Sequence, residues 1–209
     1  MSHLLIKTCI DWARQLPAGK FGAHLFPEFE KRAKAASTEI FRVKTAVEAR
    51  EVVCNLARFT NARKVVSVSS PLQEASGIDA ALTAIGIDVH SDPVAVAQHA
   101  PTADIGISGV EFGIAETGSV CQDGYAIESR LVSTLPPLHV AFLDSNLIVP
   151  GIIEAFEIIS RVFDRGCISF ITGPSRTADI ERVLTIGVHG PSRFVIVAVD
   201  GEQGKGVAA

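Results

Sequence analysis

Between residues 39 and 90, apolar segments of strand length alternate with segments of helix length. Strand patterns cover residues 39–44, 64–69 and 87–90, and helix patterns cover residues 47–59 and 77–85. Strands that alternate with helices are typical of βαβ units and a parallel sheet. Val65–Val68 is almost entirely β-favouring, as expected for a strand that is covered on both faces. The pattern therefore predicts an α/β fold with a mainly parallel sheet.

The rest of the chain continues this pattern with one glycine-rich interruption. Further strands are predicted at 138–143, 167–172 and 194–199, and a further helix at 151–163. Within residues 103–122, glycines stand at 106, 109, 113 and 118. They indicate either bulged strands or a backbone that another group approaches closely. The turn AETGSV (residues 115–120) has the Thr-Gly pair of a β-hairpin.

The N-terminal part has a different pattern. Up to about residue 37 it is helical, with Phe21, Leu25, Phe29 and Ala33 spaced to form one apolar stripe. We therefore expect a helical arm at 1–37, which packs on the domain or on a second subunit, and an α/β domain at 38–209.

Composition and charge restrict the functional class. A chain of 209 residues that is 47% hydrophobic fits one ordinary domain. A net charge of −4 gives no basic face for nucleic acid. His3, Lys7 and Asp11 interrupt the apolar start where a signal peptide would be uniformly apolar, and no segment is long enough to span a membrane. We expect a cytoplasmic protein.

The usual cofactor motifs are missing from the sequence. Cys9, Cys54, Cys121 and Cys167 are far apart, and no C-x-x-C pair could hold zinc or an iron–sulfur cluster. Neither the phosphate-binding loop motif nor the dinucleotide fingerprint is present. The sequence predicts no metal site and no bound cofactor, so the protein purified alone should be colourless.

The segment ITGPSRTADIERVLTIGVHGP (residues 171–191) is rich in turn signals. Gly173-Pro174 ends a strand, and Ser175 or Thr177 could cap a short helix that begins near Ala178. A loop that leads into a helix N-terminus is a natural anion site, for which Ser175, Arg176 and Thr177 could supply donors. Asp179 and Glu181 would favour a singly charged carboxylate over a polyphosphate. A capped turn without a ligand is the alternative.

These motifs resemble a known family. GPSRTADIE, GVHGP and the upstream AETGSV occur in the order found in the lactate-utilisation protein C family, the LUD domain, and the resemblance covers roughly residues 35–200. It implies a three-layer α/β domain with an inserted β-hairpin, similar to the superfold of sugar isomerases and CoA transferases. It also implies a component of an iron–sulfur system for bacterial growth on lactate, whose own reaction is not assigned.

Candidate site residues come from these loops. In the CoA transferases of the similar superfold a glutamate attacks a thioester, so by analogy Glu116 could act as acid, base or nucleophile, although their surrounding signature is absent. The candidate ligand-binding residues are Thr117, Gly118, Ser119, Arg130, Gly173, Ser175, Arg176, Thr177 and His189. Arg130 could instead form a surface salt bridge. His139, within the apolar run LHVAFL, is expected to be a core residue.

Two functions remain open at this point. The first is a component without a redox centre that binds a small carboxylate or the iron–sulfur subunits of a lactate oxidase system. The second is an enzyme that acts on a small carboxylate, thioester or sugar phosphate through Glu116. In both cases AETGSV and GPSRTADIE should lie close together at the carboxyl edge of one sheet, where ligands usually bind in α/β proteins. The loop Ser69–Pro71 should open at that same edge.

Overall fold

The computed structural model describes residues 7–163, 166–178 and 184–200. For residues 177–178 and 184–186 it describes only the backbone. Among the described residues, no helix has the length and apolar character needed to cross a bilayer.

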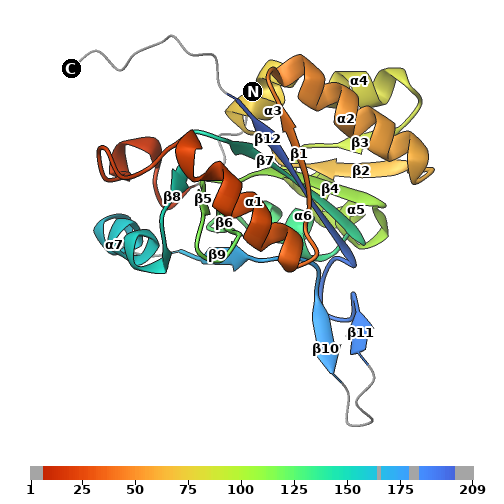
Figure 1. Cartoon of the computed structure of the whole chain (residues 1–209). Helices are drawn as coiled ribbons and strands as arrows, with labels where there is room; N and C mark the ends of the chain where they lie inside the picture. Colours follow the sequence, from red (N-terminus) through yellow and green to blue (C-terminus); the bar gives the residue numbers. More distant parts are fainter. Residues whose placement is uncertain (1–6, 164–165, 179–183, 201–209) are drawn as a thin grey trace.

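A six-stranded parallel sheet forms the centre of the molecule (Figure 1). Its strand order is β1-β12-β7-β4-β2-β3, and every neighbouring pair is parallel. The strands are β1 (Glu39–Val43), β2 (Lys64–Ser67), β3 (Asp88–His90), β4 (Ile105–Gly109), β7 (Leu138–Asp144) and β12 (Arg193–Val199). The predicted α/β class with a mainly parallel sheet is confirmed.

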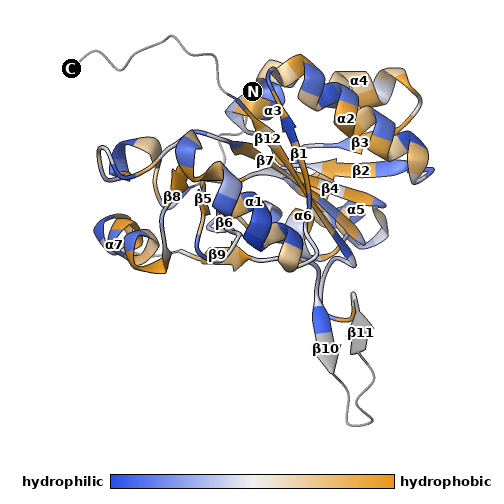
Figure 2. Ribbon diagram, in the orientation of Figure 1, coloured by the Kyte–Doolittle hydropathy of each residue, from blue (hydrophilic) through white to orange (hydrophobic). Residues whose placement is uncertain are grey.

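Both faces of this sheet are apolar and covered, which makes three layers (Figure 2). Alternate residues of β7 enter different cores: Val140 packs with the helices of one face, and Ala141 packs on the other face. The first face carries α2 (Ala46–Phe59), α3 (Pro71–Ser76) and α4 (Ile78–Ala84). The second carries α5 (Pro93–His99), α6 (Ile127–Thr134) and α1 (Phe26–Ala35).

A smaller sheet of order β8-β5-β6-β9 adjoins the second face. It consists of β5 (Phe112–Ile114), β6 (Ser119–Asp123), β8 (Ile148–Val149) and β9 (Ile168–Ile171), and α7 (Ile152–Val162) packs on it. β5 and β6 are antiparallel, so AETGSV is the predicted hairpin turn. β9 forms the strand predicted at 167–172, but it pairs with β6 in the second sheet and is not part of the main sheet.

Local capping explains where several helices begin. The Thr45 side chain accepts a hydrogen bond from the N–H of Glu48 at 3.1 Å, which satisfies a free donor at the start of α2. The Asp92 carboxylate accepts from Val94 at 3.0 Å at the start of α5. Thr45 lies directly before the helix predicted at 47–59, so that boundary was predicted to within a few residues, whereas α5 was not predicted from the sequence.

The N-terminal residues pack on the α/β body. The predicted helical pattern forms α1 and two three-residue 3-10 turns, at Ala13–Gln15 and Ala23–Leu25. Elsewhere in the chain, a 3-10 turn at Ala100–Thr102 follows α5. Phe26 and Phe29 are buried in the same core cluster as Ile196 of β12. The division at residue 37 remains a prediction about organisation, and α1 shares its core with the sheet that follows.

The segment after β9 differs from its prediction. Residues 176–178 and 184–186 form an antiparallel hairpin, β10 (Arg176–Ala178) and β11 (Leu184–Ile186), which extends away from the sheets in Figure 1. The predicted helix near Ala178 is therefore wrong. TADIERVLTI contains five β-branched residues at 177, 180, 183, 185 and 186, and these favour extended backbone over helix. Asp179 and Glu181 lie outside the described residues.

Candidate functional site

The GPSR segment is fixed against the end of α1. Gly173 has φ +141°, and a Cβ at this position would lie 2.4 Å from the carbonyl oxygen of Ala36, so only glycine fits. The Arg176 guanidinium donates to the Ala36 carbonyl at 2.8 Å and also to the Ser37 hydroxyl. Arg176 therefore satisfies backbone groups at the C-terminus of a helix, where positive charge is favourable.

Ser175 and His189 form the base of the hairpin. The Ser175 N–H donates to the Pro191 carbonyl and the Ser175 carbonyl accepts from Gly187, both at 2.9 Å. The Ser175 hydroxyl accepts from the His189 N–H at 3.3 Å. Ser175 is therefore a hairpin residue and not the predicted helix cap. The imidazole of His189 is exposed. Thr177 pairs with Thr185 in the hairpin, and its side chain lies outside the described part.

This loop cluster lies at the amino edge of the parallel sheet, not at the predicted carboxyl edge. Its backbone neighbours Ala36, Pro137 and Pro191 directly precede β1, β7 and β12, and Ser192 N–H donates to the Pro137 carbonyl at 2.9 Å. The prediction failed because it placed β9 in the main sheet. β9 belongs to the second sheet, so its carboxyl end points to a different edge.

The AETGSV turn meets this cluster from the other side. Gly118 has φ +68°, and a Cβ there would lie 2.1 Å from the Ala33 nitrogen, so the hairpin turn rests directly on α1. Thr117 Oγ1 accepts from the Ser119 N–H at 3.3 Å. The buried Ser119 hydroxyl is 2.8 Å from the Thr172 hydroxyl. This hydrogen bond joins two motifs that are 53 residues apart.

The structure assigns Glu116 and Arg130 to other surroundings. The exposed Glu116 carboxylate accepts from the Ile152 N–H at 3.0 Å, which caps the start of α7. Arg130 is an exposed residue of α6, and its side chain packs beside Gly124 at the far end of β6. Ser119, Gly173, Ser175 and Arg176 are thus in one cluster, whereas the Glu116 side chain contacts the start of α7 and Arg130 lies on α6.

A cavity of about 320 Å³ lies within the cluster. It is lined by Ala36, Thr172, Gly173, Pro174 and Arg176, and we refer to it as the motif pocket. Among these residues, Arg176 has a guanidinium and Thr172 a hydroxyl, and both are suitable donors for a carboxylate. The carbonyls at the end of α1 compete for the same guanidinium, so a ligand would have to share or replace these hydrogen bonds.

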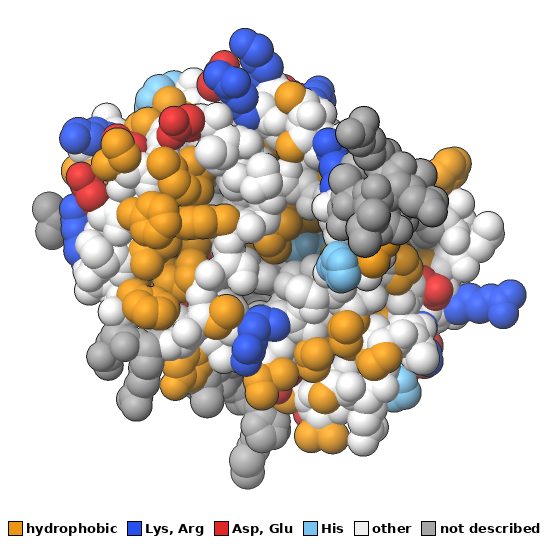
Figure 3. Space-filling model, turned by 90° about the horizontal axis from the view of Figure 1, so that it is seen from below, with side chains coloured by type: hydrophobic (Ala, Val, Ile, Leu, Met, Phe, Trp, Pro, Cys, Tyr) orange, Lys and Arg blue, Asp and Glu red, His pale blue; other side chains and the backbone are white. Residues whose placement is uncertain are grey.

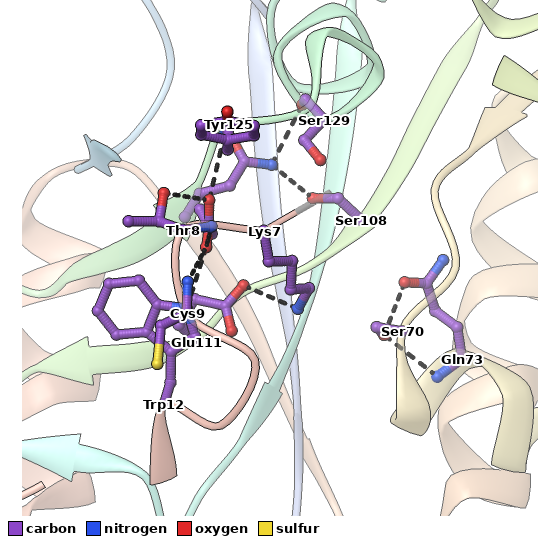
Figure 4. Close-up of polar contacts among 12 residues, drawn as sticks. Lys7, Thr8, Cys9, Trp12, Ser70, Gln73, Ser108, Glu111, Tyr125 and Ser129 are labelled. Carbon is purple, nitrogen blue, oxygen red and sulfur yellow. Dashed lines mark hydrogen bonds and ion pairs between the residues drawn. The ribbon is translucent and has the colours of Figure 1, made fainter. Parts of the chain in front are cut away.

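A second polar cluster was not predicted from the sequence (Figure 4). Asp123, 4% exposed at the end of β6, accepts five hydrogen bonds from other groups. They come from the N–H and hydroxyl of Thr8, the N–H of Cys9, the indole of Trp12 and the N–H of Tyr125, at 2.7 to 3.3 Å. This carboxylate fixes the N-terminal segment to the second sheet.

Beside it, Lys7 and Glu111 form an ion pair. Lys7 Nζ lies 3.2 Å from Glu111 Oε1. Burial raises the pKa of Glu111, and the positive charge of Lys7 opposes that shift. In Figure 4 the Lys7 side chain extends towards the side where Ser70 and Gln73 lie, beyond the ends of β2 and β4.

A set of hydrogen bonds links the main sheet to the second sheet. The Ser108 hydroxyl is 2.8 Å from His139 Nε2 and accepts from the Gln122 amide at 3.1 Å. His139 is fully buried and stacks on Phe194, so its prediction as a core residue is confirmed. Burial lowers the pKa of His139 to about 3, so its imidazole is neutral near pH 7. A neutral, enclosed imidazole of this kind supports packing better than proton transfer.

The predicted carboxyl-edge loop Ser69–Pro71 lines a separate cavity. Its volume is about 250 Å³, and Ser69, Gln73 and Asp79 are among its lining residues. Burial raises the pKa of Asp79, while the Ser67 and Ser91 hydroxyls oppose the shift. With Glu74 also at its wall, this cavity is acidic and less suited to a carboxylate than the motif pocket.

Among the described residues, no group of three or more His, Cys, Asp or Glu side chains could hold a metal ion. The four cysteines are free thiols, of which Cys54 and Cys121 are buried.

Curated relatives are named lactate utilization protein C. The protein of that name from Halalkalibacterium halodurans is 29% identical over 78% of this chain and 71% of its own length. Lactate utilization protein C 1 from Bacillus mycoides is 36% identical over 49% of this chain and 46% of its own length. Lactate utilization protein C from Bacillus subtilis is 38% identical over 49% of this chain and 45% of its own length. In several relatives, therefore, the match spans less than half of the protein.

A solved structure has the same fold. The crystal structure of a duf162 family protein from Deinococcus radiodurans aligns with a TM-score of 0.60 over 88% of this chain and 99% of that chain, at 22% identity. The sequence model of the LUD domain matches residues 26–199, which include both sheets and α1. The chain therefore belongs to the LUD domain family.

Proposed function

We propose that this protein is a component of a lactate-utilisation system and that it binds a small carboxylate in the motif pocket. Its relatives carry the name of that process. The observation that best supports the site is that Arg176 and Thr172 both line one pocket of about 320 Å³. The volume accommodates a three-carbon acid with water, and the guanidinium and hydroxyl suit its charge.

In this proposal the protein carries no redox centre, and electrons pass through iron–sulfur subunits that it accompanies. The widely spaced cysteines and the absence of a dinucleotide motif in the sequence support this division of roles. The protein would then deliver or retain the acid, or orient it for a partner subunit.

Isothermal titration with lactate and with pyruvate tests the pocket. Arg176→Ala should weaken binding by about 10-fold to 150-fold, which corresponds to about 1.5 to 3 kcal/mol for a charge-assisted hydrogen bond. Thr172→Val keeps the side-chain shape and should weaken binding to a smaller degree. Arg14→Ala is the matched control, because Arg14 is an exposed arginine outside the site. Equal affinities for all four proteins would disprove the proposal.

Folding has to be measured beside binding, because Arg176 also bonds to the end of α1. If Arg176→Ala melts near the wild-type temperature and loses binding, the side chain acts on the ligand. If it melts far lower, the arginine is a structural cap. Complementation of a lactate-growth defect extends the same comparison to the cell, where only a folded variant that fails to restore growth supports the proposal.

The enzymatic alternative depends on Glu116. Its carboxylate already accepts the Ile152 N–H, a contact typical of a helix cap. Glu116→Gln keeps an acceptor oxygen, so α7 should still be capped. Loss of lactate-dependent growth in this variant at an unchanged melting temperature would favour catalysis, whereas normal growth would leave Glu116 as a cap.

A further inference from the structure

A buried hydroxyl lies beside the motif pocket. Thr38 is 3% exposed, and its Oγ1 has no hydrogen-bond partner among the residues that the structure describes. Burial without a partner is unfavourable, because the hydroxyl loses its hydrogen bonds to water and gains none within the protein. Native folds contain few groups of this kind, so the position of Thr38 is informative about what binds nearby.

Gly173 brings this hydroxyl and a backbone carbonyl to one side of the pocket. A Cβ on Gly173 would lie 3.4 Å from Thr38 Oγ1 and 2.4 Å from the Ala36 carbonyl oxygen. Gly173 and Ala36 both line the motif pocket. The two oxygens are therefore close to each other and close to the ligand that the pocket would hold.

The face that contains the pocket has little acidic charge around its centre. Figure 3 shows the molecule from the side to which the β10–β11 hairpin extends in Figure 1, and the motif pocket lies at the base of this hairpin. Among the described side chains, those of Asp and Glu lie towards the rim of this face. A negatively charged acid can therefore approach the centre without strong repulsion from them.

Binding of a carboxylate to Arg176 changes the hydrogen bonds at this point. The Ala36 carbonyl accepts from the Arg176 guanidinium at 2.8 Å in the free protein. When the ligand carboxylate takes this donor, the carbonyl loses it and lies beside the unpaired Thr38 hydroxyl. A ligand that satisfies both oxygens therefore binds better than one that satisfies only the guanidinium.

We propose that Thr38 is a ligand-binding residue of the motif pocket and that it selects 2-hydroxy acids over 2-oxo acids. This inference rests on the proposed function, in which Arg176 holds the carboxylate. A 2-hydroxyl can donate to the Ala36 carbonyl and accept from the Thr38 hydroxyl. A keto oxygen can only accept, so it leaves the carbonyl without a donor. One polar group left unpaired in this way corresponds to a preference of about 5-fold to 150-fold.

Isothermal titration with lactate and pyruvate tests the selection. The wild type should bind lactate about 5-fold to 150-fold more tightly than pyruvate. Thr38→Val replaces the hydroxyl with a methyl group, so it should weaken lactate binding and remove most of the preference. Thr83→Val is the matched control, because the exposed Thr83 hydroxyl donates to the Asp79 carbonyl in α4, on the other face of the main sheet. Its affinities should equal those of the wild type.

Thermal unfolding without ligand separates a binding role from a structural one. Because Thr38 Oγ1 is buried without a partner, its replacement by a methyl group should leave the melting temperature of Thr38→Val at or above that of the wild type. A clearly lower melting temperature would mean that the hydroxyl holds the fold together, and it would overturn the proposal.

The titration also distinguishes failure of this inference from failure of the proposed function. A wild type that binds neither acid would overturn both. A wild type that binds the two acids equally, or a Thr38→Val variant that keeps the preference, would overturn the role of Thr38 alone. The motif pocket would then remain a site for carboxylates in general.

Discussion

His139 shows how burial determines the chemistry of a single residue. Its ring lies between the Ser108 hydroxyl and Phe194, and the residue is fully buried. Because desolvation lowers its pKa to about 3, the folded protein does not bind a proton here above that pH. The unfolded chain binds one below its ordinary pKa of about 6.5. Lowering the pH therefore favours the unfolded state at His139, because only the unfolded chain binds a proton there.

Stability should consequently fall with pH between about 6.5 and 3. In this window the unfolded state binds more protons, so the contribution of His139 is complete above pH 6.5 and is lost as the pH falls. Between pH 7 and pH 5, protonation of His139 in the unfolded chain should lower the free energy of unfolding by about 2 kcal/mol. Urea unfolding at both pH values should show this difference in the wild type and a smaller one in His139→Gln. Exposed His189→Gln is the control, and an identical pH dependence in all three proteins would refute the argument.

Asp123 is the anchor of the N-terminal segment. Its carboxylate is buried and accepts five hydrogen bonds, so Asp123→Asn, which replaces an acceptor with a donor, should cost about 2 to 3 kcal/mol. Trp12 is the single tryptophan, and its indole bonds to Asp123. Its fluorescence should therefore shift to the red in Asp123→Asn before global unfolding. Asp11→Asn, at an exposed position, should change neither quantity.

At the level of elements, the contact between α1 and the β5–β6 turn determines how the two sheets sit together. Gly118 permits it, because the turn backbone approaches the Ala33 nitrogen more closely than any side chain would allow. The same α1 end receives Gly173 and Arg176 from the segment after β9. The C-terminal end of α1 therefore contacts both the AETGSV turn and the GPSR segment.

Comparing the stability of Gly118→Ala with that of Gly19→Ala distinguishes the cost of a steric collision from the cost of backbone strain. Both glycines have a left-handed φ, +68° and +75°, so alanine should cost about 1 kcal/mol of strain at either site. Only at Gly118 would the new Cβ also collide with the backbone, whereas Gly19 has nothing within 4 Å. Thermal unfolding should show a loss of at least about 2 kcal/mol for Gly118→Ala. Similar losses for both variants would mean that the close contact is unimportant.

Elements whose signals are local were predictable, and those that depend on distant partners were not. Five strands of the main sheet, including those of Val65 and Val140, are short apolar runs that were expected within a few residues. The sixth, β4, lies in the glycine-rich segment, for which bulged strands were one of two interpretations. β8 has only two residues and pairs with β5 far away in sequence, so no periodicity reveals it. The hairpin at residues 176–186 was missed because capping signals outweighed β-branched content in the interpretation.

The candidate site was predictable in part for the same reason. Turn chemistry marked Gly118 and Gly173, and both have backbone conformations that need glycine. The prediction that both motifs lie at the carboxyl edge was wrong, because their position depends on which sheet β9 joins. The Asp123 cluster had no local signal, since Thr8 and Asp123 are 115 residues apart and only the fold brings them together.

At the scale of the whole molecule, the fold separates its surfaces. The motif pocket lies at the amino edge of the main sheet and the acidic cavity at Ser69 lies at its carboxyl edge. A ligand in the motif pocket would therefore lie at the opposite edge of the main sheet from the acidic cavity.

The position of β12 has a consequence for how this chain is made. β12 lies between β1 and β7, yet it follows both of them in sequence. Before residues 193–199 emerge from the ribosome, β1 therefore has no neighbouring strand and β7 has one unpaired edge, so the sheet can close only after they have emerged. Folding during translation cannot proceed strand by strand from the N-terminus. Nascent chains that stop before Arg193 should stay sensitive to protease and should depend on chaperones that cover exposed strand edges.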